Sequence, residues 1–354
     1  MTRRPIPRVR GAILAPMTSR TSTRYPDFFI VGAPKCGTTA MYDYLRQHPD
    51  IFMPFHKEPL YFGSDLTRRY GAMSTREYLD LFRDAHPRQR VGEASAWYLY
   101  SATAADEIHR VVPDARIIVM LRNPVDVMHA QHSQLLFSDQ EDIVDFEDAL
   151  AAEEDRARGE RLPAGPIRTE NVLYRRMVRF AEQLERYLGV FGRDSVHVII
   201  YDDFRQDTAG EYRKVLDFLG VDRNAVVDFR ASNENKVVKA EWLQRLIWNP
   251  PLLRPLIPRL RRYRAVHAAR RGLLALNSRR HRREAIDASL RERLTRELEP
   301  EVVRLGRLIG RDLSGWTRAA PALATQLNRA SSALGAEATE RANASEAPMA
   351  AKRR

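Results

Sequence analysis

The chain has 354 residues, of which 44% are hydrophobic and 29% charged, a composition that excludes a collagen-like, coiled-coil or wholly disordered protein. Lysine and arginine outnumber aspartate and glutamate by 58 to 46, which gives a formal net charge of +12. Such a balance is typical of a protein that binds a polyanion, although an arginine-rich surface facing solvent would produce it as well.

The N-terminal region, residues 1–25, is basic and aperiodic and predicts a disordered leader. The apolar run at 11–17 follows several arginines, but it is short and contains a glycine and a proline, so we do not expect a signal peptide. The single cysteine, Cys36, excludes an internal disulfide and a cysteine-based metal cluster. No stretch approaches the roughly 18 apolar residues of a membrane span. We therefore expect a cytoplasmic protein.

Three short apolar runs, at residues 27–31, 116–121 and 196–201, predict buried parallel strands. A glycine loop and an amphipathic helix follow the first run. A long amphipathic helix from Leu173 to Gly192 precedes the third run, and a helix over 211–219 follows it. Strands that alternate with helices predict a single α/β domain, a P-loop-like parallel sheet flanked by helices, with ligands at the carboxyl ends of the strands.

The C-terminal third changes character twice. Residues 230–285 are irregular and very basic, and residues 286–310 are again helical in pattern. From residue 317 on, the chain is rich in alanine and has no aromatic residue, so it cannot bury enough apolar surface to fold and predicts a disordered tail.

The loop after the first strand carries the clearest chemical signal. Residues 32–39 read Gly-Ala-Pro-Lys-Cys-Gly-Thr-Thr and lead into a helix, whose first backbone N–H groups and dipole form an anion site. Lys35 adds a charge, and Thr38 and Thr39 add hydroxyl groups. A nucleoside-triphosphate P-loop would have lysine at position 38, after the second glycine. Here the lysine lies inside the loop, two residues before the second glycine, where it would sit beside a phosphate that carries a transferring group and would not span β- and γ-phosphates.

Residues 28–39 (FFIVGAPKCGTT) resemble the 5′-phosphosulfate loop of sulfotransferases that use 3′-phosphoadenylyl sulfate, in particular the heparan-sulfate-type branch and its bacterial relatives. The resemblance implies that the loop, with Cys36, Gly37, Thr38 and Thr39, holds the 5′-phosphate and the sulfonate. It implies that Lys35 stabilises the leaving phosphate oxygen. It also implies sulfuryl transfer, without a metal, to a hydroxyl or amine of a carbohydrate, lipid or other small molecule.

The family places the 3′-phosphate on an arginine that ends a buried strand and on a serine eight residues later. Residues 121–126 (LRNPVD) resemble this motif and assign Arg122, with a surface arginine that pairs with Asp126 as the alternative. Position 130 is alanine, whereas Ser133 lies one helical turn further along the same face. We assign Ser133 in place of the missing serine, and expect weaker 3′-phosphate binding or another donor.

Two further segments resemble parts of the family's active site. Residues 91–98 (VGEASAWY) resemble the segment with the catalytic glutamate, which makes Glu93 the candidate base, with a glutamate at a helix start as the alternative. Residues 56–62 (HKEPLYF) resemble a segment that borders the active site, where Lys57 would hold the sulfonate unless it is a solvated loop lysine.

A basic run at residues 277–283 (NSRRHRR) lies where the family has a cationic loop over the 3′-phosphate. Arg279 and Arg280 are the candidates for that contact, with a solvated basic turn as the alternative. His129 and His132 are three residues apart on a predicted helix, but the sequence offers no third ligand for them, so we expect no metal site.

The sequence therefore predicts a leader at 1–25, a sulfotransferase domain at 26–316 and a tail at 317–354. Two other functions stay open. A P-loop NTPase or kinase is favoured by Asp202, which follows the third strand as a Walker B aspartate would. A nucleic-acid-binding protein would use the arginines of 254–283, although nucleic acid is not the partner that we expect.

Overall fold

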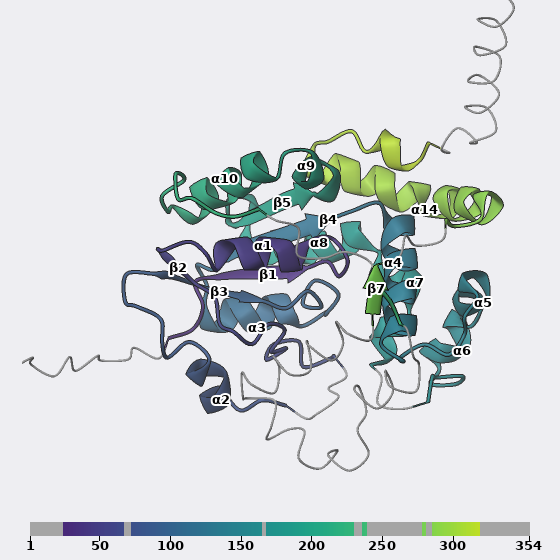
Figure 1. Ribbon diagram of the computed structural model, residues 1–354, viewed down its shortest axis with the longest axis horizontal. Coiled ribbons are helices and arrows are strands. Elements are labelled where there is room, and N and C mark those ends of the chain that lie inside the picture. The colour runs from purple at the N-terminus through teal and green to yellow at the C-terminus, as the bar shows by residue number, and fades with distance from the viewer. Residues whose placement is uncertain are drawn as a thin grey trace, which may run out of the picture.

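The computed structural model describes residues 24–66, 72–164, 168–229, 236–238, 278–280 and 285–318. Its centre is a parallel five-stranded sheet (Figure 1). In spatial order, the strands are β2 (Ile51–Phe52), β3 (Arg90–Ala94), β1 (Phe28–Gly32), β4 (Arg116–Leu121) and β5 (Val196–Ile200). The predicted fold class, a P-loop-like parallel sheet flanked by helices, is confirmed.

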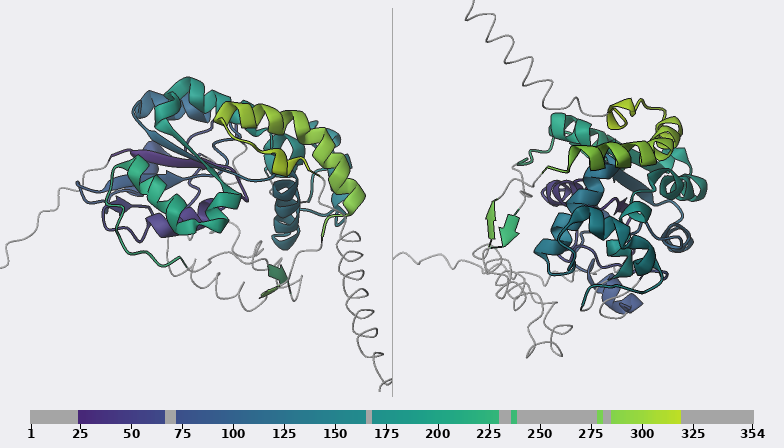
Figure 2. Two further views of the ribbon diagram at one scale, coloured as in Figure 1. Left: turned by 90° about the horizontal axis from the view of Figure 1, so that it is seen from above. Right: turned by 90° about the vertical axis from the view of Figure 1, so that its right-hand side faces the viewer.

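Helices cover both faces of the sheet (Figure 2). On one face lie α1 (Thr38–Leu45), α9 (Tyr201–Gln206) and α10 (Thr208–Leu219). There the Tyr44 ring of α1 contacts the rings of Phe204 and Tyr212, with centroids 6.2 and 6.4 Å away. On the other face, α3 (Ala104–Val111) packs against α8 (Phe180–Phe191). The fully buried strand β1 is thus enclosed between two helical layers.

The remaining elements lie around the sheet and its two helical layers (Figure 1). They are α2 (Thr75–Asp80), α4 (Pro124–Phe137), α5 (Phe146–Ala151), α6 (Glu153–Ala157), α7 (Tyr174–Met177), α14 (Ala288–Ile309) and short 3-10 helices at Thr169–Val172, Arg193–Ser195 and Ser314–Trp316. Strands β6 (Lys236–Val238) and β7 (Ser278–Arg280) pair antiparallel, and β6 lies beside α4.

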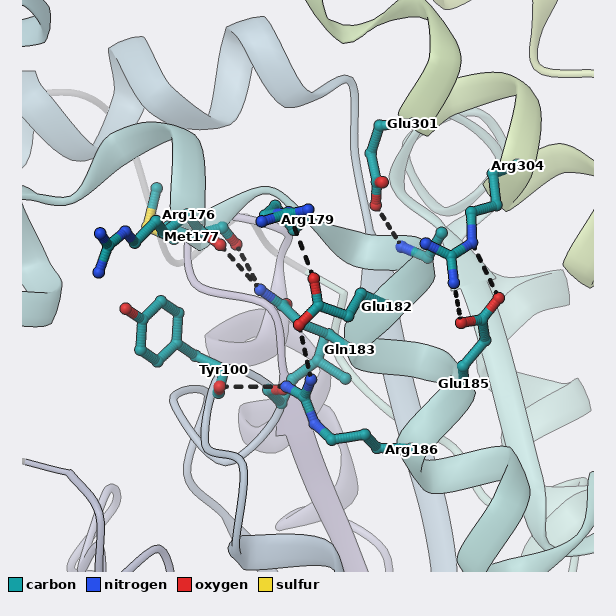
Figure 3. Close-up of polar contacts among 12 residues, drawn as sticks. Tyr100, Arg176, Met177, Arg179, Glu182, Gln183, Glu185, Arg186, Glu301 and Arg304 are labelled. Carbon is teal, nitrogen blue, oxygen red and sulfur yellow. Dashed lines mark hydrogen bonds and ion pairs between the residues drawn. The ribbon is translucent and has the colours of Figure 1, made fainter.

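The C-terminal helix α14 packs along α8, as Figure 3 shows. Glu301 accepts a hydrogen bond from a backbone N–H of α8 at 2.6 Å, and Arg304 Nε donates to Glu185 Oε1 at 3.0 Å. On α8, Arg186 Nη2 donates to the backbone carbonyl oxygen of Tyr100 at 3.2 Å. Helix α8 therefore connects the C-terminal helix to the turn that follows β3.

The structure differs from the sequence prediction at several places, and β2 is one strand that was not predicted. Strand β3 was not predicted, because it carries Gly92 and Glu93 where a typical buried strand has large apolar residues; a Cβ at Gly92 would lie 2.1 Å from the Phe28 ring. The long helix predicted from Leu173 is broken, since the backbone leaves helical geometry at Arg179 (ψ 62°). Tyr201 begins α9 and does not end a strand.

The predicted leader lies outside the described residues except for 24 and 25, as does the basic region 230–285 except for β6, β7 and residue 285. Of the predicted tail, the structure describes only 317 and 318. Within the described ranges, no helix is both long enough and apolar enough to cross a membrane.

Candidate active site

The loop between β1 and α1 is shaped for an anion. Gly37 (φ 94°) precedes α1 without a side-chain cap, so the N–H groups of the first turn are available to a ligand. A Cβ at Gly37 would lie 3.2 Å from the Tyr201 ring and 3.3 Å from the end of the Met120 side chain. Lys35 also has a positive φ, 65°, which is uncommon for any residue other than glycine. Backbone conformation and space therefore both favour glycine at position 37.

The loop side chains divide into buried and accessible groups. The thiol of Cys36 is fully buried, and burial raises its pKa to about 12 against the opposing effect of the Arg122 and Lys35 cations. Cys36 is therefore a protonated packing residue and not a nucleophile. Thr38 is buried and Thr39 half-buried at the start of α1. Lys35 Nζ reaches α4, where it donates to a side-chain oxygen of Gln134 at 3.4 Å.

Arg122 lies at the end of β4, the strand beside β1, so it shares one edge of the sheet with the loop. Its guanidinium stands over the Tyr201 ring, 4.8 Å from the centroid, and its Nη2 lies 3.5 Å from Asp126 Oδ2. The Asp126 carboxylate also accepts from Arg291 Nη2 of α14 at 2.7 Å. The pairing of Arg122 with Asp126, which the sequence analysis gave as the alternative to phosphate binding, is thus present, within a cluster that adds a second arginine.

The residues of α4 that were considered for the 3′-phosphate are engaged within the protein. Ala130 is 1% exposed, and Ser133 Oγ donates to the backbone carbonyl oxygen of His129 at 2.8 Å. His132 is buried and its Nε2 lies 2.9 Å from the carbonyl oxygen of Ile143. His132 therefore packs as a structural residue of this helix, and the His129 ring lies beside that of Phe146, with centroids 5.2 Å apart. Within the described ranges no three His, Cys, Asp or Glu side chains cluster as metal ligands.

Glu93 lies in β3 and is paired in register with Phe29 of β1. Phe29 lies three residues before Gly32, where the loop begins. The side chain is fully buried, and its Oε2 accepts hydrogen bonds from the hydroxyls of Tyr78 at 2.9 Å and Tyr98 at 3.0 Å. Burial raises the pKa of Glu93 to about 7, against the lowering effect of neighbouring hydroxyls. A carboxyl group that titrates near neutral pH suits proton transfer. The alternative of a glutamate at a helix start is wrong, because Glu93 is in a strand.

Lys57 belongs to a segment that runs beside the end of β3. The backbone N–H of Glu58 donates to the carbonyl oxygen of Ala94 at 3.0 Å, which fixes this segment next to Glu93. Lys57 Nζ donates to Glu58 Oε1 at 2.6 Å, and the lysine side chain is 18% exposed. The alternative of a solvated lysine does not describe this paired, largely buried side chain.

Arg279 and Arg280 lie in β7. Its partner strand β6 is beside α4, the helix that carries Ser133. Strand β7, with Arg279 and Arg280, therefore pairs with β6, which lies beside α4, the helix that follows Arg122.

Sequence reasoning missed four residues of this site. Tyr201 packs against both Gly37 and Arg122, and Gln134 contacts Lys35. Tyr78 and Tyr98 hold Glu93. Tyr98 ends the segment 91–98 that carries Glu93, but the resemblance gave no site role to any of these four residues.

Comparison with known proteins agrees with this geometry. Residues 26–225 match the sulfotransferase family. Heparan sulfate glucosamine 3-O-sulfotransferase 6 of Homo sapiens is 30% identical over 204 residues, 56% of this chain and 54% of that protein. Carbohydrate sulfotransferase 15 of Homo sapiens is 27% identical over 254 residues, 55% of this chain and 44% of that protein. The chain thus spans about half the length of the curated relatives it matches.

A solved structure is similar over a larger share of the chain. The crystal structure of a sulfotransferase from Alicyclobacillus acidocaldarius is 31% identical, with a TM-score of 0.63, and the match covers 83% of this chain and 99% of that one. With residues 26–225 matched as well, the chain belongs to the sulfotransferase family.

Proposed function

We propose that the protein transfers a sulfuryl group from 3′-phosphoadenylyl sulfate to a hydroxyl group of a carbohydrate. One observation carries the proposal: Lys35, in an anion-binding loop, and Arg122 follow adjacent strands, so two cationic positions share one edge of the sheet. Two such positions suit a nucleotide with phosphates at both its 5′ and 3′ positions. The carbohydrate acceptor is suggested by the names of the curated relatives, which include heparan sulfate glucosamine and carbohydrate sulfotransferases.

The residues that hold the donor follow from this arrangement. The first-turn N–H groups of α1, with Thr38 and Thr39, bind the 5′-phosphate and the sulfonate, and Lys35 stabilises the charge that develops on the phosphate oxygen. Arg122 binds the 3′-phosphate. The donor supplies an activated sulfonate whose leaving group is a phosphate. Transfer then requires positioning and charge stabilisation more than covalent catalysis.

Glu93 takes the proton of the acceptor hydroxyl, which its near-neutral pKa of about 7 permits. Lys57 assists at the sulfonate from the segment beside β3. Ser133, Arg279 and Arg280 stay predictions for the 3′-phosphate. For Ser133 this role requires its hydroxyl to leave the carbonyl oxygen of His129.

Donor binding is tested by thermal unfolding in EDTA with adenosine 3′,5′-bisphosphate. At about a hundred times Kd, mass action adds about 2.7 kcal/mol, a rise in Tm of about 4–5 °C for a domain of this size. Arg122→Ala should remove most of this rise, whereas Arg223→Ala, an exposed arginine paired with Asp217, should keep it. Stabilisation by magnesium ATP without any response to the bisphosphate would instead favour the kinase.

Transfer is tested with sulfur-labelled donor and a panel of acceptors: unsulfated heparosan, chondroitin, a simple aryl alcohol and an aryl amine. We expect label in a polysaccharide hydroxyl, and a rate of labelling lower by about a hundredfold or more with Lys35→Ala. Label in the aryl compounds alone would contradict the carbohydrate acceptor while leaving sulfuryl transfer in place.

The two rival functions have weaker support. Asp202, the residue that favoured an NTPase, accepts a hydrogen bond from the Trp316 indole N–H at 2.9 Å, so its Oδ2 is engaged in packing. The arginines of 254–283 that would serve nucleic-acid binding lie outside the described residues except for 278–280. Retention on DNA resin that survives saturation with the bisphosphate would support that function.

The cytoplasmic location and the division into 1–25, 26–316 and 317–354 also stay predictions. Subcellular fractionation tests the first. Limited proteolysis with mass spectrometry tests the second, and we expect a resistant fragment that begins near residue 26 and ends near residue 316.

A further inference from the structure

The carboxyl group of Glu93 is held asymmetrically. Both tyrosine hydroxyls, those of Tyr78 and Tyr98, donate to the same oxygen, Oε2. The other oxygen, Oε1, is also buried, and no donor among the described residues makes a hydrogen bond to it, although the nearby Ser95 hydroxyl, which accepts from the backbone N–H of Leu60, lowers the pKa of Glu93. A buried carboxylate oxygen without a donor costs free energy, so an arrangement that leaves one oxygen unpaired calls for an explanation.

The two tyrosines are themselves fixed in place. The backbone N–H of Phe62 donates to the hydroxyl oxygen of Tyr98 at 3.2 Å, which directs the tyrosine's own hydrogen to Glu93. The Tyr78 ring stacks on Tyr61, with centroids 4.0 Å apart and planes 9° apart. Burial raises the pKa of both hydroxyls well above the ordinary tyrosine value, so both remain donors.

We propose that Tyr78 and Tyr98 are positioning residues for sulfuryl transfer: by occupying Oε2 of Glu93, they make Oε1 the oxygen that takes up the proton. The inference rests on the proposed function. Two donors fill the acceptor positions of Oε2, so a proton that arrives at the carboxylate binds Oε1. The same donors stabilise the ionised form, in which Glu93 can act as a base.

The step is balanced as follows. The acceptor O–H bond breaks and its proton passes to Glu93 Oε1, while the acceptor oxygen forms a bond to sulfur. The bond from sulfur to the 5′-phosphate oxygen breaks, and its electron pair leaves with adenosine 3′,5′-bisphosphate. In this step Tyr78 and Tyr98 neither gain nor lose a proton.

Other titratable groups face Glu93 and bear on its pH response. They are Glu58, from the segment beside β3, and Tyr187, from α8. Glu58 raises the pKa of Glu93 through charge repulsion but is itself paired with Lys57. Tyr187 is as buried as Tyr98, yet its hydroxyl donates to the backbone carbonyl oxygen of Tyr98 at 2.9 Å and not to Glu93.

Tyr187→Phe is therefore a matched control for Tyr78→Phe and Tyr98→Phe. Each variant removes one hydroxyl from a buried ring, but only the latter two remove a donor to Glu93. The first readout is the pH dependence of kcat at saturating donor. The second, independent of activity, is the titration of the Glu93 carboxyl C=O band in infrared difference spectra against Glu93→Gln.

We expect Tyr78→Phe and Tyr98→Phe each to move the acid limb of kcat and the infrared midpoint upward by about one pH unit, the effect of losing one hydrogen bond to a charged group. The KM for the donor should stay unchanged, because the hydroxyls that are removed donate to Glu93 and not to the phosphate loop. Tyr187→Phe should leave both midpoints at their wild-type values.

Two results distinguish a failure of this inference from a failure of the proposed function. If the wild type transfers sulfuryl groups and neither variant moves the midpoint beyond Tyr187→Phe, the tyrosines serve packing alone and the inference is wrong. If the wild type transfers none but the infrared midpoint moves in the variants, the proposed function is wrong, while the effect of the tyrosines on Glu93 stands. Should one variant not fold, the other decides.

Discussion

Replacing Arg156 by methionine should destabilise the fold strongly. Arg156 and Glu141 form an ion pair in which both side chains are 0% exposed, with Nη1 to Oε2 at 2.7 Å and Nη2 to Oε1 at 2.6 Å. The Tyr174 hydroxyl donates to the same carboxylate at 2.6 Å, as do two backbone N–H groups. Arg156→Met removes two of these five hydrogen bonds and the only positive charge among the five donors.

The loss in the free energy of unfolding follows from the buried Glu141 carboxylate that remains without its ion-pair partner. A buried charge that loses its partner destabilises a protein by about 3–5 kcal/mol, whereas an exposed ion pair contributes about 0–1 kcal/mol. Arg158→Met provides the control, because Arg158 is 56% exposed and pairs with Asp155. We therefore expect a loss of about 3–5 kcal/mol in the free energy of unfolding for Arg156→Met and of less than about 1 kcal/mol for Arg158→Met.

The pH dependence sharpens this test. Burial by itself would raise the pKa of Glu141, but hydrogen bonds from Arg156 and Tyr174 hold it below its usual value. In the wild type this group therefore contributes stability above the unfolded pKa, and the contribution is lost as the pH falls. Without Arg156, burial dominates and the folded pKa rises above the unfolded one. The deficit of Arg156→Met should then be larger at pH 8 than at pH 5.

The assay is urea unfolding followed by tryptophan fluorescence at both pH values. A variant within about 1 kcal/mol of wild type at pH 8, or a deficit that grows toward pH 5, would refute the reasoning. Glu141→Gln combined with Arg156→Met should recover part of the loss, because the amide replaces the uncompensated charge.

Three further predictions concern single side chains. Lys35→Ala should lower kcat by about a hundredfold or more, the loss expected for a charge partner of the transition state, and a kcat within threefold of wild type would contradict its role. Calorimetric titration of adenosine 3′,5′-bisphosphate should show Ala130→Ser gaining about tenfold in affinity if the 3′-phosphate lacks a serine partner; if Ser133 is that partner, the gain should be absent and Ser133→Ala should lose about tenfold, so an unchanged Ser133→Ala contradicts its assignment. Tyr212→Phe should leave the stability unchanged or raise it by about 1 kcal/mol in urea unfolding, since the buried Tyr212 hydroxyl has no partner among the described residues, and a loss above 1 kcal/mol would contradict this.

Local sequence signals predicted the parts of the fold that depend on neighbours in the chain. The apolar run 116–121 is β4 to the residue, and Gly192 and Gly220 end the helices that they were predicted to end. The phosphate loop was readable because the strand, the glycines and the helix that position Lys35 are contiguous.

Contacts across the sheet were not readable in the same way. Tyr201 packs under Arg122 because β5 lies beside β4, and nothing in the periodicity of either strand specifies that order. Glu93 is stabilised in a buried strand by Tyr78 of α2, a partner that lies before β3 and outside any motif. Because β3 is short and contains both a charged residue and a glycine, its sequence pattern did not indicate a buried strand.

Helix α14 has a consequence for where the folding unit ends. The family match stops at residue 225, yet Arg291 binds Asp126 next to Arg122, and the carbonyl oxygen of Trp316 accepts from Asn123, the cap of α4. A chain shortened to the matched region would lose both contacts and uncover the face of α8 on which α14 packs. The region that matches the sulfotransferase family is thus smaller than the region that must be expressed. If a chain shortened to that region were inactive, the cause would be the lost packing of α14 and not a missing catalytic residue.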